Sequence, residues 1–366
     1  MGILRVILAL FVVLDHFRSF SSFYFPGGEF AVKVFFIISG FYMTMILDKK
    51  YVGKGSYTLF LSNRFLRLYP IYWVVLGLTI GASFISYFVF NDWLRLTQYV
   101  VYHDIMNIKT LVFQGFTNIF LFGQDVVMFI GMDPEKGTMY FSGDFTKTYP
   151  QFHTFLFVPQ AWTIGLELLF YLIAPFIVRR NIKVIVLLIA GSLIIRGFIY
   201  FNLGMQNDPW TYRFFPNELS LFLIGTISYH LYNYIYKNPV NKIFNKIVVI
   251  IYFSVLIFYE YLPNFEFAMD IKSVLFYTLT GISIPSLFML TKNSKIDNRI
   301  GDLSYPIYIV HMFIIMITSL LIVKFDLHLN KGLFVVIFTI LASYVLVKYV
   351  SDPIEKIRQK RVKISK

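Results

Sequence analysis

Arg5 and His16 are the first two residues of this sequence whose types and spacing could do chemistry together. They lie 11 positions apart. On a helix this spacing places both on one face, about 16 Å apart along the axis. An imidazole suits proton transfer near pH 7, and a guanidinium suits an anion. The spacing therefore favours a general base deep in a helix with an anion site at its mouth. The alternative is an interhelical hydrogen bond for His16 and a topology charge for Arg5.

Arg64 and Arg67 form a second candidate anion site. They lie three positions apart, so both face the same side of a helix at the start of the apolar run 68–90. Two guanidinium groups in this arrangement suit a phosphate-rich ligand, because each can contact two phosphate oxygens. The alternative is that both arginines only anchor the chain at the cytoplasmic surface.

Glu167 and Tyr171 are neighbours, four positions apart, within the apolar run 160–178. A carboxylate inside such a run is energetically expensive and needs a reason. It could orient an imidazole or bind a sugar hydroxyl. The alternative is an ion pair with Arg18 or Arg196 that only supports packing.

A third group of polar residues lies in the run 302–323. Ser304 and Tyr305 open this run, and His311 follows two turns later. This imidazole could take part in chemistry or form an interhelical hydrogen bond. Ser39, which precedes a glycine in an earlier run, could contact a ligand or simply allow close helix packing.

The composition indicates which elements must hold these residues. Of the 366 residues, 57% are hydrophobic and only 14% are charged, whereas a soluble domain has about 25% charged residues. So few charges cannot cover a water-soluble surface, which excludes a soluble enzyme. The absence of Cys excludes disulfides, thiolate metal sites and a Cys nucleophile.

The sequence therefore predicts an all-α integral membrane protein with about ten transmembrane helices, each needing about 20 apolar residues. The expected helices cover 3–24, 30–47, 68–90, 160–178, 184–201, 214–236, 247–262, 271–291, 302–323 and 332–350.

The basic residues give the expected bundle a direction. Every second short loop, the C-terminal tail and Arg5 together hold 22 of the 33 Lys and Arg, and the opposite side holds 9. This bias predicts that both termini are cytoplasmic. The membrane domain is expected to cover 1–351, with an extracytoplasmic cap of short helices at about 91–159 between the third and fourth helices. The segment 352–366 is expected to be a short basic cytoplasmic tail on anionic lipid.

Five short signatures follow one another along the chain. They are Arg5-x10-His16, Phe36-Ile-Ile-Ser39-Gly40-Phe41, Arg64-x-x-Arg67-Leu-Tyr-Pro70, Trp162-Thr163-Ile-Gly-Leu-Glu167 with Tyr171, and Ser304-Tyr305-Pro-Ile-Tyr308-x-x-His311. In this order they resemble acyltransferase family 3, the integral membrane acyltransferases that modify bacterial surface glycans. The resemblance covers essentially the whole chain, about 1–355.

The resemblance implies transfer of an acyl group, usually acetyl, from cytoplasmic acyl-CoA to a sugar hydroxyl of a cell-surface or lipid-linked glycan. It implies catalytic roles for His16, Glu167 and Tyr171, with His16 as the general base on the acceptor hydroxyl. Glu167 would orient His16 or the acceptor. The residues expected to bind donor or substrate are Arg5, Arg64, Arg67, Ser39, Trp162, Ser304, Tyr305 and His311.

The same resemblance sets the expected surroundings of the protein. It implies a multi-pass protein of the bacterial inner membrane, with acyl-CoA as a substrate and with no permanently bound cofactor or metal. Membrane lipids are expected partners and nucleic acid is not, while a homo-oligomer is left open. The chain looks like a stand-alone member without a C-terminal hydrolase-like domain. Its run Ser351-Asp352-Pro353 departs from the family's Glu and Pro, so the tail is given no chemistry.

Several alternatives stay open at this point. Buried ionisable residues also mark transporters, which would move acyl groups or glycan without forming a bond. A structural subunit of a polysaccharide-synthesis complex is a second rival. Within the enzyme class, the acyl group could be succinyl or the acceptor a non-glycan molecule, and either direct transfer or a covalent acyl-enzyme would fit. The sequence has no Gly-x-Ser-x-Gly or His-Glu-x-x-His motif, which disfavours hydrolases.

Overall fold

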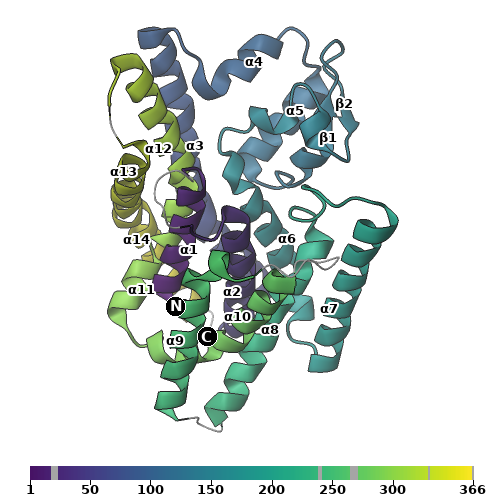
Figure 1. The fold of residues 1–366 in the computed structure, drawn as a ribbon, viewed down its shortest axis with the longest axis vertical. Helices are drawn as coiled ribbons and strands as arrows, with labels where there is room; N and C mark the ends of the chain where they lie inside the picture. Colours follow the sequence, from purple (N-terminus) through teal and green to yellow (C-terminus); the bar gives the residue numbers. More distant parts are fainter. Residues whose placement is uncertain (18–23, 238–240, 264–270, 329, 365–366) are drawn as a thin grey trace.

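Long helices dominate the structure, a computed structural model that describes residues 1–17, 24–237, 241–263, 271–328 and 330–364 (Figure 1). Each apolar run expected from the sequence overlaps one long helix. These helices are α1 (Gly2–Asp15), α2 (Gly28–Lys49), α3 (Ser56–Phe90), α6 (Trp162–Ile177), α7 (Ile182–Gly197), α8 (Phe215–Lys237), α9 (Lys242–Ile257), α10 (Ile271–Thr291), α12 (Ser304–Phe325) and α13 (Lys331–Leu346). The expected helical class is therefore confirmed.

The short elements fill the connections between these helices. The short α-helices are α4 (Thr97–Tyr102), α5 (Ile108–Phe120), α11 (Lys295–Gly301) and α14 (Asp352–Ile364). Two strands, β1 (Ile130–Met132) and β2 (Met139–Phe141), pair antiparallel. The 3-10 turns span Leu94–Leu96, Val126–Phe129, Phe145–Lys147, Phe152–Phe155, Pro159–Ala161 and Tyr259–Tyr261, and π turns span Phe198–Asn202 and Val347–Ser351.

Seven stretches of the described chain are long and apolar enough to cross a membrane. They are Gly28–Lys49, Ser56–Phe90, Pro159–Ile177, Ile182–Asn202, Ile271–Thr291, Lys295–Phe325 and Lys331–Val362. Helix α1 has 14 residues, which gives it a length of about 21 Å against a hydrocarbon core of about 30 Å. Ten spanning helices and the sidedness of the bundle therefore stay predictions.

Helix α1 ends at Asp15, earlier than the apolar run 3–24 suggests. The end of α1 lies against the start of α2. A Cβ built on Gly28 would lie 3.3 Å from the Asp15 carboxylate. A carboxylate at a helix N-terminus is favourable because it faces the positive end of the helix dipole. Residues 18–23, including Arg18, lie outside the described part of the chain.

Helix α2 is central to the bundle and packs on α8, α1, α10 and α6. Its closest approach is to α8, where a Cβ on Gly40 would lie 1.9 Å from the carbonyl oxygen of Phe222. A Cβ on Gly225 of α8 would likewise lie 2.0 Å from the Ile37 carbonyl oxygen. These two glycines let the helix backbones touch, as small residues do in membrane bundles. Close packing is therefore the role of the glycine beside Ser39.

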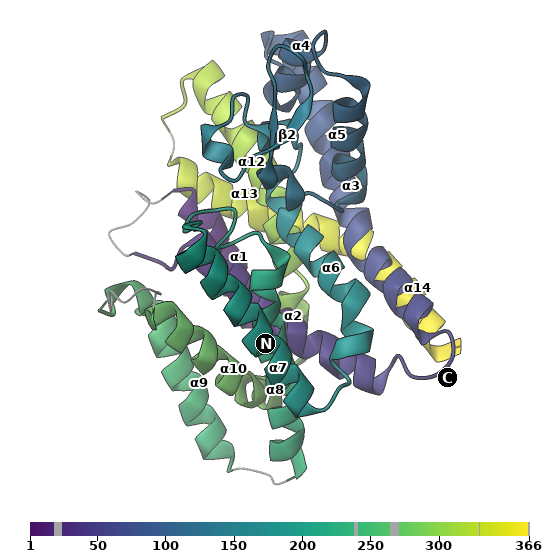
Figure 2. The ribbon, with the colours of Figure 1, turned by 90° about the vertical axis from the view of Figure 1, so that its right-hand side faces the viewer.

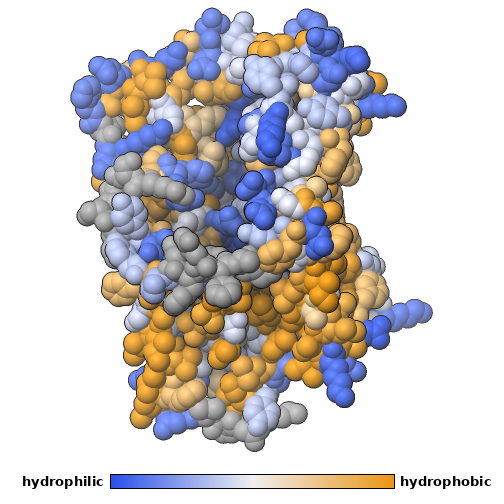
Figure 3. All heavy atoms as spheres, turned by 45° about the vertical axis from the view of Figure 1, so that its right-hand side comes forward, coloured by the Kyte–Doolittle hydropathy of each residue, from blue (hydrophilic) through white to orange (hydrophobic). Residues whose placement is uncertain are grey.

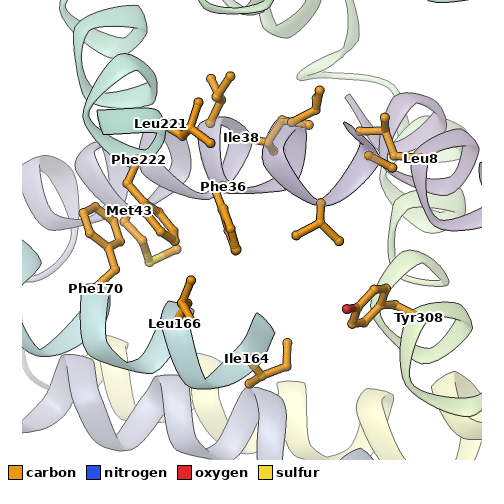
Figure 4. Close-up of a cluster of buried hydrophobic side chains, with 14 of the residues drawn as sticks. Leu8, Phe36, Ile38, Met43, Ile164, Leu166, Phe170, Leu221, Phe222 and Tyr308 are labelled. Carbon is orange, nitrogen blue, oxygen red and sulfur yellow. The ribbon is translucent and has the colours of Figure 1, made fainter. Parts of the chain in front are cut away.

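Aromatic rings fill the space between α2, α6 and α8 (Figure 4). The ring of Phe222 stacks on Phe36 at 4.7 Å and on Phe170 at 4.3 Å between centroids. Offset stacking of this kind adds to the free energy gained from burying the rings. The cluster fixes α6 against α2 and so fixes the side chains that these helices present to each other.

Residues 91–159 fold as short helices, turns and one hairpin. In this hairpin Gly131 of β1 faces Tyr140 of β2. The segment has its own apolar cluster, formed by Tyr102, Val127, Met132, Phe152, Phe155 and Leu156. On the face drawn in Figure 3, hydrophilic residues gather over the upper part of the molecule, and apolar residues dominate the lower part.

The C-terminal helix α14 lies beside the first turns of α3 (Figure 2). Arg361 donates a hydrogen bond to Ser62 Oγ at 2.8 Å. Arg299 of α11 forms two parallel hydrogen bonds with the Asp352 carboxylate, at 2.7 and 2.8 Å. The tail is thus an ordered helix with one face against the protein.

Candidate functional site

An inner cavity lies where α1, α2, α3, α6 and α12 meet. Seven of the site residues predicted from the sequence line it: Arg5, Ser39, Arg67, Glu167, Tyr171, Ser304 and Tyr305. The remaining wall is mostly apolar and aromatic, with Val32, Phe35, Phe36, Ile38, Tyr42, Met43, Leu68, Thr163, Ile164 and Tyr308. Residues from five separate helices thus converge on one space.

Glu167 and Tyr171 occupy consecutive turns of α6 and face the inner cavity. The Tyr171 hydroxyl donates a hydrogen bond to Glu167 Oε2. Ser39 of α2 lines the same cavity. A carboxylate and two hydroxyl groups therefore line one space with mostly apolar walls, where hydrogen bonds are stronger than in water.

The structure answers one half of the packing alternative for Glu167, the pairing with Arg196. Arg196 of α7 pairs with Glu218 of α8 at 2.7 Å, so Arg196 serves that buried carboxylate instead. Arg18, the other suggested partner, lies outside the described residues.

Arg5 reaches the inner cavity from α1. Asp297 holds the start of α1, because it accepts hydrogen bonds from the backbone N–H groups of Gly2 at 2.7 Å and Ile3 at 3.0 Å. The Arg5 guanidinium donates to the carbonyl oxygen of Gly301 and lies 6.0 Å from the ring centre of Tyr42. Its Nε has no hydrogen-bond partner.

A second cavity lies next to the first. We call it the basic mouth, because its cationic lining residues are Arg5, Lys50, Arg64, Arg67 and Arg358. Its acidic lining residues are Asp302, Asp352 and Glu355. Arg5, Tyr42, Met43, Arg67 and Tyr305 line both spaces. A ligand with a charged end and a thin apolar arm could therefore span the two.

Arg64 and Arg67 both face the basic mouth, as the spacing predicts. Arg64 is 5% exposed, and its Nε has no hydrogen-bond partner. Among the described residues, no carboxylate forms an ion pair with either arginine. Helix α3 starts three turns before the apolar run, which carries Arg64 into the protein.

His16 and His311 form a pair at the other end of α1, with ring centres 5.4 Å apart. His16 is exposed, follows the last turn of α1 and does not line the inner cavity. His311 is fully buried, and its Nδ1 lies 2.7 Å from the carbonyl oxygen of Tyr308. A carbonyl can only accept, so Nδ1 carries the proton. The Nε2 of His311 has no hydrogen-bond partner and can accept a hydrogen bond.

Tyr308 connects the histidine pair with the inner cavity. It lines the cavity, and its ring centre lies 5.9 Å from that of His311. Its hydroxyl donates to the carbonyl oxygen of Gln160 and accepts from Thr163 Oγ1, both at 2.9 Å. Sequence reasoning gave Tyr308 and Thr163 no role. Their positions, three before His311 and four before Glu167, could have indicated a shared helix face.

Three predicted residues remain: Trp162, Ser304 and Tyr305. Trp162 does not line the cavity, and the Arg213 guanidinium lies 4.2 Å from its ring centre. Ser304 lines the cavity, and its Oγ donates to the Gly301 carbonyl at 2.8 Å. Tyr305 donates to the Leu68 carbonyl at 2.7 Å.

In the described part of the chain, no group of His, Asp and Glu is arranged to hold a metal ion.

Comparisons with known proteins show the family of this chain. A family model described as an acyltransferase domain, of acyltransferase family 3, matches residues 1–348. The chain is similar to "Protein 2 in picA locus" of Rhizobium radiobacter, with 38% identity over 87 residues. That match covers 24% of this chain and 45% of the relative, so the chain spans less than half of that protein's length. No solved structure matches significantly.

Proposed function

Because the chain belongs to acyltransferase family 3, we propose that this multi-pass membrane acyltransferase moves an acetyl group from acetyl-CoA to a sugar hydroxyl of a cell-surface or lipid-linked glycan. One observation carries the proposal: the basic mouth and the inner cavity lie next to each other and share five lining residues. Together they lead from unpaired arginines to Glu167, Tyr171 and Ser39. In this proposal the mouth faces the cytoplasm of a bacterium, and the membrane is the inner membrane.

Acyl-CoA fits these two adjoining cavities by its chemistry. The phosphates would lie against Arg64 and Arg67 in the mouth, because each guanidinium group can bind two oxygens of one phosphate. The pantetheine arm would run past Arg5 and Tyr42 into the inner cavity. A small acyl group suits the apolar walls at the end of that path.

The reaction joins the acceptor oxygen to the thioester carbonyl carbon and breaks the C–S bond. The hydroxyl proton goes to a general base, and the CoA sulfur leaves as a thiolate that is then protonated. We assign the base to His16, whose ring packs on His311; this assignment requires the acceptor hydroxyl to lie between the inner cavity and the histidine pair, near Tyr308. Glu167 bonds to Tyr171 and lines the cavity, so we assign it to the acceptor and thioester side. Ser39 would donate to the developing oxyanion, and Tyr171 could do so only by turning its single hydroxyl proton away from Glu167.

The reaction itself is the first test. Purified protein in nanodiscs, incubated with acetyl-CoA and host glycan, should release free CoA thiol and transfer the acetyl group. Mass spectrometry of the host's surface glycan with and without the protein should show a mass difference that identifies the acyl group. Unchanged glycan and no CoA release would contradict the proposal and leave the transporter, which forms no bond.

His16→Ala tests the assigned base. Loss of general-base catalysis should lower transfer by about 100-fold or more, with acetyl-CoA binding retained, because His16 does not line the cavity. His103→Ala, an exposed histidine in the cap, is the matched control. Full activity of a normally inserted His16→Ala variant would remove the base role from this residue.

A further inference from the structure

The C-terminal helix α14 forms one wall of the basic mouth. It covers Asp352–Ile364 and lies beyond the residues that the family model matches, which end at 348. Its residues that line the mouth are Asp352, Ile354, Glu355, Arg358 and Gln359. The tail that the sequence left without chemistry is therefore next to the proposed donor path.

Two contacts hold α14 in this position. The Arg299–Asp352 pair fixes its first residue with two parallel hydrogen bonds, at 2.7 and 2.8 Å. Arg361 fixes its third turn to Ser62 of α3, at 2.8 Å. Because both ends of the segment between them are held, the side chain of Arg358 has a defined place in the mouth.

Arg358 is 9% exposed and faces other arginines. Its Nη1 donates to Glu355 Oε2 on its own helix, while its Nε has no partner. The positive charges of Arg64 and Arg67 repel the positive charge of Arg358. Three guanidinium groups in one cavity repel each other, and Arg299 already engages Asp352. An anion in the space between them would remove this repulsion.

We infer that α14 is part of the donor site and that Arg358, with Arg64 and Arg67, binds a phosphate of the nucleotide end of CoA. This inference rests on the proposed function, since it assigns α14 to the same donor. A phosphate of an anionic lipid offers the same chemistry, so the test separates the two sources.

The test measures CoA affinity by calorimetry on the full chain in nanodiscs of phosphatidylcholine. Arg358→Gln should weaken CoA binding by about tenfold or more, as expected when a hydrogen bond to a charged group is lost. Arg358→Lys should recover part of the affinity, because it keeps the charge but not the fork. Lys360→Gln, an exposed cation of the same helix, should bind CoA as the wild type does.

A second readout separates binding from a structural effect. The KM for acetyl-CoA should rise in Arg358→Gln, while the KM for acetyl-pantetheine, which has no phosphate of the nucleotide end, should not change. An equal rise for both donors, or wild-type CoA affinity in Arg358→Gln, would overturn the role of α14.

The remaining outcomes are also decisive. If the wild type releases CoA from acetyl-CoA and Arg358→Gln changes only binding to phosphatidylglycerol vesicles, the anion is a lipid and the inference fails alone. If the wild type neither binds CoA nor turns over acetyl-CoA, the proposed function fails instead.

Discussion

Glu167 and His16, the two proton carriers that sequence spacing singles out, lie in different surroundings. Glu167 lines the inner cavity, where Tyr171 occupies one of its carboxylate oxygens. The other oxygen can accept a hydrogen bond from a ligand. His16 instead contacts the ring of His311 outside the cavity lining. The polar residues therefore form two groups, one in the inner cavity around Glu167 and one at the histidine pair. Tyr308 lies between these two groups.

Glu167→Gln tests the role of the carboxylate in the inner cavity. The amide keeps the size of the side chain but loses the charge, so kcat for acetyl transfer should fall by about 100-fold. Acetyl-CoA affinity should stay near that of the wild type, because the phosphates are assigned to the basic mouth. Free-thiol release and calorimetry check the two quantities. Glu135→Gln in the cap, an exposed carboxylate, is the control, and equal activities of the two variants would exclude Glu167.

Asp125 of the cap should make stability depend on pH. Burial raises its pKa from 3.8 to about 6. The folded state therefore holds the proton more tightly than the unfolded state, so the contribution of Asp125 to stability is complete below about pH 3.8 and is lost as the pH rises through 6. Ionising this carboxyl costs about 3 kcal/mol.

Asp125→Asn removes this ionisation. The variant should melt at a higher temperature than the wild type at pH 7.5, and the difference should shrink as the pH falls toward 4. Melting curves of the purified protein in detergent at several pH values measure both. A difference that stays constant with pH would show that Asp125 does not titrate in this range.

At the scale of elements, the contact between α2 and α8 positions the site. It places Ser39 on the cavity side of α2, while Gly40 meets the backbone of α8. Thr44 of α2 and Thr226 of α8 are joined by a hydrogen bond at 3.0 Å one turn further on. Close backbone contact and buried hydrogen bonds are what hold helices together in lipid, because burying apolar surface gains little there.

Gly225→Ala tests this contact. The new Cβ would lie 2.0 Å from the Ile37 carbonyl oxygen, so the two helices must separate, at a cost of about 1–3 kcal/mol. The melting temperature, followed by size-exclusion chromatography after heating, should fall. Gly191→Ala on α7, where a Cβ meets open space, should melt at or above the wild-type temperature. A stable Gly225→Ala variant would contradict the tight packing.

At the scale of the whole molecule, the distribution of charge predicts how the bundle sits in the membrane. The basic loops and the tail are expected on the cytoplasmic side, and the cap of residues 91–159 on the other. The basic mouth, with Lys50, Arg64 and Arg358, then opens to the side on which acyl-CoA is made.

Introduced cysteines test this orientation without background, because the chain has no Cys. In right-side-out vesicles, a membrane-impermeant maleimide should label Lys136→Cys, in the cap. It should label Lys54→Cys, before α3, only after the vesicles are opened. Wild-type protein is the unlabelled control. Labelling of both positions from the same side would show that the predicted topology is wrong.

The local features of the fold and the site could be read from the sequence. Each apolar run is a helix, because a chain in lipid must satisfy its backbone hydrogen bonds within the segment. The contact between Glu167 and Tyr171 follows from their spacing on one helix. The same spacing argument correctly placed Arg64 and Arg67 on a common face. Hydropathy did not predict the early end of α1, because it does not report that Asp15 lies against the start of the next helix.

Only the tertiary structure decided which distant residues meet. His16 lies against His311, Arg196 is paired with Glu218, and α14 lies along α3. Hydropathy cannot choose among such pairings, because a lipid-facing side chain and a protein-facing one are equally apolar. The choice depends on shape and hydrogen bonding between helices, as at Gly40 and Gly225. These contacts exist only in the folded bundle, and they bring the mouth, the cavity and the histidine pair together.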